Sequence, residues 1–143
     1  QKVVCGSPDY LSKHGLPNHP ADLAYHQIIQ SSAVEPSTTW WFESSEGKTS
    51  VRVSPRLQFN QNDSAISAVK SGYGVTRLMS YQVGEEFQSG SLVRILQGHE
   101  PEPIPINIVY LEGLRASAKI RSFVDLAKER LQNNPLINHQ IKP

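Results

Sequence analysis

The chain has 143 residues, 38% hydrophobic and 19% charged, a size and composition that suit one compact globular domain. Fourteen Lys and Arg against 13 Asp and Glu give a net charge of +1, which is too small to indicate a nucleic-acid-binding surface. A lone Cys5 excludes an internal disulfide and a CxxC pair, and the sequence has no run of about 20 apolar residues such as a membrane helix needs.

The first 30 residues predict short elements separated by prolines. Val3 and Val4 end an apolar strand, and Ser7-Pro8 supplies a helix N-cap followed by proline at the first helical position. A second helix is expected to start at Pro20, and the run Gln27-Ile28-Ile29-Gln30 predicts a buried strand.

The middle of the chain predicts more strands. The aromatic step 40–42 is typical of core or strand packing. Hydrophobic residues occupy alternate positions from Val51 to Phe59, the period of a half-buried strand, and Pro55 is expected to bend this strand or place it at a sheet edge.

A helix capped by Asn62 or Asp63 should follow and end at Ser71-Gly72. A strand is expected at 75–79, a short helix at 80–87 and another strand at 92–96.

Arg77 is unusual because it lies inside an apolar strand. It either pairs with a carboxylate or extends its charged end to the surface, and the second interpretation is favoured.

The last third predicts an alternating strand at 106–110 and an amphipathic helix from about Ser117 to Leu131. The polar tail after Asn133 is expected to be a loop. Strands that alternate with helices favour an α/β domain with mainly parallel pairing.

The order and spacing of four segments resemble the sensing domains of LysR-type transcriptional regulators. Val3–His26 resembles the family's first strand, its Ser-Pro-x-Tyr-Leu helix and its Pro-x-Asp-Leu helix. Asn62–Leu96 resembles the capped helix, Gly-x-Gly strand and Gly-x-Leu-Val strand, and Pro103–Leu131 resembles the return strand and last helix. The step 40–42 before a valine-rich strand is a weaker match.

The resemblance implies an α/β, type II periplasmic-binding-protein-like sensing domain of two lobes, with one lobe complete and the other partial. Crossover strands are expected near 27–31 and 106–110. On this reading 1–27 is partial lobe I, 28–106 is lobe II, 107–132 is the return strand and C-terminal helix of lobe I, and 133–143 is a tail.

Ligands of open α/β sheets collect beyond the carboxyl ends of strands, near helix N-termini. Several polar residues hold such positions, and they are the candidate effector-binding residues. They are Ser31, Ser32, Asn62, Asp63, Ser64, Ser80, Tyr81 and, at the second crossover, Tyr110. Helix capping alone also explains these Ser and Asn residues.

The resemblance implies a cytoplasmic, homo-oligomeric regulator whose effector is a small organic acid or an aromatic compound. DNA would be bound only through an N-terminal domain outside this sequence, and no membrane partner is expected. The sequence shows no catalytic constellation, metal-ligand spacing or cofactor motif. A periplasmic solute-binding protein fragment is the alternative, and an enzyme on a related fold is a third hypothesis.

Overall fold

The structure is a computed structural model that describes residues 1–110 and 117–138. These residues divide into two compact units, Gln1–Pro103 and Ile104–Pro143, of which the first holds every strand of the described chain. The strands are β1 (Lys2–Gly6), β2 (Ile28–Ser31), β3 (Thr39–Ser44), β4 (Gly47–Arg52), β5 (Pro55–Phe59), β6 (Val75–Met79) and β7 (Val93–Ile95).

The helices of the first unit are short. They are α1 (Pro8–His14), η1 (Pro20–Tyr25), α2 (Asn62–Lys70), η2 (Ser80–Gln82), α3 (Gly84–Ser89) and η3 (Gln97–His99). Ser7 caps α1 as expected, because its Oγ accepts a hydrogen bond of 3.3 Å from the Tyr10 N–H. The expected cap of α2 was wrong, since Gln61 is its N-cap residue and makes no side-chain capping bond.

Five strands form one sheet in the order β5-β2-β6-β1-β7. Strands β5, β2 and β6 run parallel, whereas β1 is antiparallel to both of its neighbours, so the pairing is mixed rather than mainly parallel. The sheet therefore brings the carboxyl ends of β5, β2 and β6 to the same edge as the start of β1.

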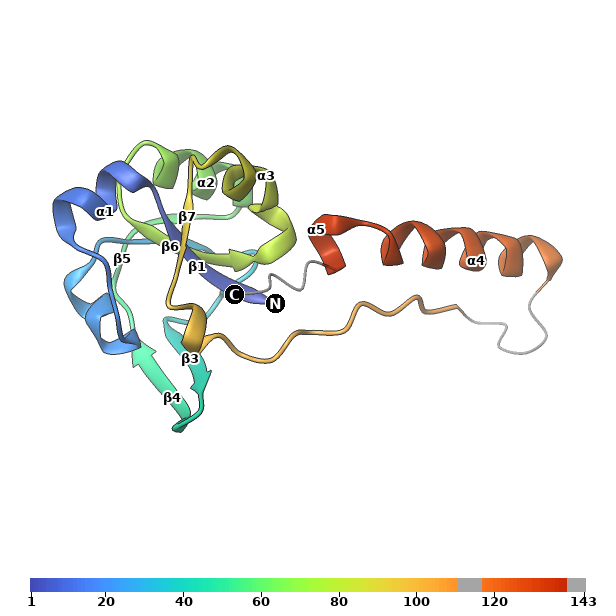
Figure 1. Ribbon diagram of the computed structural model, residues 1–143, viewed down its shortest axis with the longest axis horizontal. Helices are drawn as coiled ribbons and strands as arrows, with labels where there is room; N and C mark the ends of the chain where they lie inside the picture. Colours follow the sequence, from blue (N-terminus) through green and yellow to red (C-terminus); the bar gives the residue numbers. More distant parts are fainter. Residues whose placement is uncertain (111–116, 139–143) are drawn as a thin grey trace. The chain divides into compact units, whose positions relative to one another are not determined.

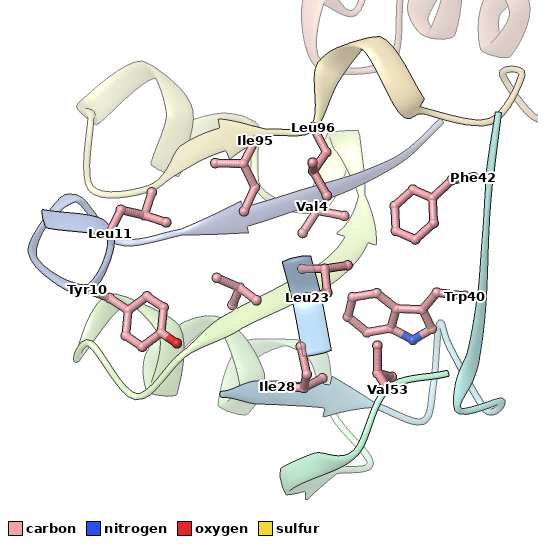
Figure 2. Packing of buried hydrophobic residues seen from close by; sticks show 11 residues of the cluster. Val4, Tyr10, Leu11, Leu23, Ile28, Trp40, Phe42, Val53, Ile95 and Leu96 are labelled. Atoms are coloured by element: carbon pink, nitrogen blue, oxygen red, sulfur yellow. The ribbon is translucent and has the colours of Figure 1, made fainter. Parts of the chain in front are cut away.

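Each face of this sheet has its own core. One face packs against α2 and α3 through a cluster that includes Ile29, Val69 and Leu78. The hairpin β3–β4 covers the opposite face (Figure 1). Figure 2 shows the Phe42 ring of β3 directed towards Val4 on the sheet and the Trp40 ring beside Leu23. The aromatic step is thus core packing, with Trp41 between them turned outward.

The alternating segment from Val51 to Phe59 forms two strands in two different sheets. Strand β4 stays in the hairpin, and Pro55 begins β5, which lies at the edge of the large sheet. An edge position suits proline because the residue has no N–H to donate to a neighbouring strand.

Gly74 allows β6 to start beside β2. A Cβ atom on Gly74 would lie 2.2 Å from the Gln27 carbonyl oxygen, which accepts a 2.9 Å hydrogen bond from the Val75 N–H. A larger residue there would push the two parallel strands apart.

Strand β1 belongs to the same sheet as the strands that follow residue 27. Strand β1, from the segment expected to belong to another lobe, pairs with β6 and β7 in the middle of the sheet. Its Val3, Val4 and Cys5 are fully buried in the two cores. Residues 1–27 are therefore part of the same unit as the strands that follow.

The second unit contains α4 (Ala118–Gln132) and the short α5 (Pro135–Asn138). Ser117 caps α4 through a 3.4 Å bond from the Ile120 N–H. The strand expected at 106–110 was wrong, because these residues form no strand in the described chain. The polar tail expected after Asn133 instead begins with α5, and residues 139–143 lie outside the described ranges.

Candidate functional site

The candidate site lies at the end of the sheet where β5, β2 and β6 have their carboxyl termini. We call this end of the sheet the carboxyl edge. Ser31 is the last residue of β2, and the Asn62–Ser64 segment forms the first turn of α2 directly after β5. Ser80 and Tyr81 follow β6 in η2. The parallel pairing of the three strands brings these segments to one edge.

Direct hydrogen bonds join the ends of β2 and β5. The Ser31 hydroxyl, fully buried, donates to Asn62 Oδ1 over 2.5 Å. Ser32 donates twice to the Phe59 carbonyl oxygen, from its N–H at 2.8 Å and from its hydroxyl at 3.1 Å. The serines therefore fix the position of the α2 N-terminus relative to β2.

The N-terminus of α2 gives the carboxyl edge an electrostatic preference. The first N–H groups of a helix lack partners within the helix and carry a partial positive charge, which favours anions. Asp63 lies in this turn with its side chain exposed, and its charge opposes a bound anion. The edge thus offers hydrogen-bond donors together with one local negative charge.

Ser80 connects β6 to the start of β1. Its N–H donates a 2.8 Å bond to the Gln1 carbonyl oxygen, and its side chain is half-buried. Tyr81 is exposed next to it. The side chains of both residues can contact a molecule bound at the carboxyl edge.

Tyr110 is the one candidate residue outside this cluster. It belongs to the second unit, with 45% of its surface exposed. Its role as an effector contact stays a prediction.

Sequence reasoning missed a buried ionic cluster beside the carboxyl edge. Arg77 of β6 is 2% exposed, and its Nε donates a 2.9 Å bond to Glu35 Oε2. Lys2 Nζ donates to the same oxygen over 2.9 Å. The favoured interpretation of Arg77, an end extended to the surface, was therefore wrong, and the carboxylate pairing is what the structure shows.

The cluster anchors the loop between β2 and β3. Glu35 lies in this loop, four residues beyond Ser31, and its N–H donates to the Ser31 carbonyl oxygen over 2.9 Å. The Gln30 side chain donates to the carbonyl oxygens of Glu35 and Ser37. Burial lowers the pKa of Arg77, and the neighbouring Glu35 carboxylate opposes that shift.

The one cysteine, Cys5, contributes no site chemistry. Burial raises the pKa of the Cys5 thiol to about 12, which keeps the thiol protonated and unreactive near neutral pH.

Among residues 1–110 and 117–138, no three His, Cys, Asp or Glu side chains are grouped so that they could hold a metal ion. The described helices also include none that is long and apolar enough to cross a membrane.

An open α/β sheet with polar loops at the ends of parallel strands is the arrangement of a ligand-binding α/β domain. Comparison with known families gives the more specific identity. The LysR substrate binding domain family matches residues 1–132, and the chain belongs to this family. The resemblance seen in the sequence is thereby confirmed, as is the mixed α/β fold of the type II periplasmic-binding-protein kind.

The relatives of this chain are transcriptional regulators. It is 31% identical over 137 residues to the HTH-type transcriptional regulator PtxR of Pseudomonas aeruginosa, a match covering 94% of the chain and 43% of PtxR. It is 29% identical over 132 residues to the HTH-type transcriptional regulator CrgA of Neisseria meningitidis, covering 92% of the chain and 44% of CrgA. The chain thus corresponds to less than half of each relative.

Solved structures agree with the sequence comparison. The regulatory domain of AphB in Vibrio vulnificus superposes with a TM-score of 0.78 at 28% identity, over 90% of this chain and 64% of that one. CrgA, a LysR-type transcriptional regulator from Neisseria meningitidis, superposes with a TM-score of 0.76 at 28% identity, over 93% of this chain and 45% of that one.

Proposed function

We propose that this chain is the effector-sensing part of a bacterial LysR-type transcription regulator, and that it binds a small organic acid or aromatic compound at the carboxyl edge. The observation that carries the proposal is that three parallel strands end at the carboxyl edge, where the buried Ser31 hydroxyl holds Asn62 and Ser80 follows β6. Serine and asparagine side chains donate and accept hydrogen bonds, so they suit carboxylate and hydroxyl groups of a ligand.

The proposal assigns the two units to different lobes of the sensing domain. Residues 1–103 form a lobe with its own cores, whereas the apolar side of α4 is poorly covered, with Phe123 67% and Leu126 52% exposed. We assign 104–132 to the other lobe, whose remaining elements would cover that side. Tyr110 stays a candidate effector contact of that lobe.

The intact regulator would act as a homo-oligomer in the cytoplasm and bind DNA through a separate N-terminal domain. Effector binding would favour one arrangement of the lobes and thereby change the spacing of the DNA-binding domains. Size-exclusion chromatography with light scattering on the full-length protein tests the assembly. A dimer or tetramer is expected, and a strict monomer at micromolar concentration would count against it.

A thermal-shift screen tests effector binding by the chain itself. We expect at least one small organic acid or aromatic compound to raise the melting temperature of the chain, and Ser31→Ala to reduce that shift by half or more. Ser67→Ala, an exposed serine on α2, is the matched control and should keep the full shift. A rise in melting temperature that is unchanged in Ser31→Ala would show that the compound does not bind at the carboxyl edge.

A further inference from the structure

The cluster of Lys2, Glu35 and Arg77 contains two cations and one carboxylate. Nε of Arg77 and Nζ of Lys2 each lie 2.9 Å from Glu35 Oε2, and Arg77 Nη2 also bonds to this oxygen. The side chains of Glu35 and Arg77 are 6% and 2% exposed. One positive charge of the cluster is therefore left without an opposite charge.

Arg77 is not the cation available to a ligand. Its Nη1 donates a 2.8 Å bond to the Trp41 carbonyl oxygen, and its guanidinium carbon lies 4.9 Å from the centre of the Trp40 ring. The Phe42 ring is 5.3 Å away. These contacts, together with the two bonds to Glu35, occupy the guanidinium and enclose it beneath the hairpin.

Lys2 is the open member of the cluster. Its side chain is 25% exposed, and its ammonium group has three donors, of which Glu35 takes one. Lys2 begins β1 and pairs with Met79, the last residue of β6. The antiparallel course of β1 thus puts Lys2 at the carboxyl edge, next to the Ser80 backbone that bonds to Gln1.

Other charged groups near this edge do not neutralise Lys2. The carboxylate of Glu100 is bonded to Arg94 and to the Gln1 side-chain amide. Asp63 is exposed in the first turn of α2, and no ion pair joins it to Lys2 among the described residues. A partly buried cation with spare donors is most stable with a bound anion, because desolvation is then offset by ion pairing.

We infer that Lys2 determines the specificity of the proposed effector site by binding the carboxylate of an anionic effector through Nζ. The inference rests on the proposed function and narrows its effector to compounds that carry a carboxylate. Glu35, held by Arg77, sets the position of Nζ by accepting one of its three hydrogen bonds. The remaining donors of Lys2 and the Ser80 hydroxyl contact the ligand.

Calorimetric titration of the 143-residue chain with matched acid and amide pairs tests the inference. The probes are benzoate with benzamide and succinate with succinamide, since each amide keeps the shape of its acid without the charge. We expect at least one acid to bind at least tenfold more tightly than its amide. Lys2→Gln should weaken that binding about tenfold or more, as for a lost charge-assisted hydrogen bond of roughly 1.5–3 kcal/mol.

Two further variants separate charge recognition from a loss of structure. Lys2→Arg keeps the charge and should bind the acid within about threefold of the unchanged chain. Lys13→Gln also removes a lysine that pairs with a carboxylate, Asp9, but α1 follows the opposite end of β1, so binding should not change. Circular dichroism melting of each variant confirms that it is folded.

The outcomes distinguish this inference from the proposed function. Equal affinity for acid and amide, no binding of either acid, or unchanged binding in Lys2→Gln would each overturn the role of Lys2. An uncharged compound whose binding is lost in Ser31→Ala but kept in Lys2→Gln would overturn it as well, while supporting the proposed site. Compounds that bind Lys2→Gln and Ser31→Ala as tightly as they bind the unchanged chain would overturn both the role of Lys2 and the proposed site.

Discussion

The sheet unit and the C-terminal unit differ in what covers their apolar side chains. In the sheet unit, Trp40 and Phe42 of the hairpin are fully or almost fully buried against β1 and β6. In the C-terminal unit, none of the side chains of α4 is buried, although Ile120, Val124 and Ala127 follow helical spacing. Amphipathic spacing thus shows which face of a helix is apolar. That face becomes buried only where another surface packs against it.

A matched pair of phenylalanine substitutions tests this difference most strongly. Phe42→Ala should lower the free energy of unfolding by about 3–5 kcal/mol, because it leaves a cavity under the hairpin. Phe123→Ala should change it by less than about 0.5 kcal/mol, because the ring is 67% exposed. Urea unfolding followed by tryptophan fluorescence measures both values. Similar losses for the two variants would show that α4 packs on a core within this chain.

The contribution of the buried ion pair to the free energy of unfolding of the sheet unit can be measured separately. Arg77→Met should destabilise the chain by about 3–5 kcal/mol, because Glu35 is then left buried without its main cation. The double variant Arg77→Met/Glu35→Leu should recover part of that loss, because neither charge remains buried. Urea unfolding of both variants gives the comparison. Additive losses would contradict the direct coupling of the two side chains.

A smaller effect is expected from pH, and it should arise in the sheet unit. Burial lowers the pKa of His26, and the nearby charge of His14 adds to this shift. The unfolded chain, with a His pKa of about 6.5, therefore binds protons more readily than the folded chain. This contribution to stability is complete above about pH 6.5 and is lost as the pH falls below it.

Urea midpoints measured from pH 7.5 to pH 5.5 test this dependence. His26→Gln should flatten the decline at the acid end, whereas His14→Gln should keep most of it, since burial of His26 is the larger cause. An identical slope in His26→Gln and the unchanged chain would assign the effect to other groups.

The sequence predicted where the candidate residues lie relative to the strand ends, but not how the strands pair. Ser31, Asn62 and Ser80 were expected to follow strand ends, and the parallel course of β5, β2 and β6 brings them to one edge. Lys2 was missed because only an antiparallel β1 places its first residue at that edge. Periodicity along a strand does not encode the direction of its neighbours.

Tertiary contacts explain the other differences. Arg77 stands out in its strand, but its partner Glu35 lies 42 positions earlier in a polar loop, and local patterns cannot reveal such a pair. The alternation at 106–110 suits a strand, yet a strand forms only with a hydrogen-bonded neighbour, and none pairs with this segment among the described residues. Strands β4 and β5 have the same two-residue period. The sequence pattern therefore does not show that they belong to different sheets.

The binding of a carboxylate at the carboxyl edge is tested most directly by nitrogen-15 NMR of the labelled chain during titration with benzoate and succinate. We predict that the largest amide shifts fall on Lys2, Ser31, Ser32, Asn62–Ser64 and Ser80, which come from four segments that meet at this edge. Shifts confined to the hairpin β3–β4 or to α4, with the carboxyl-edge amides unchanged, would contradict the proposed sensing site.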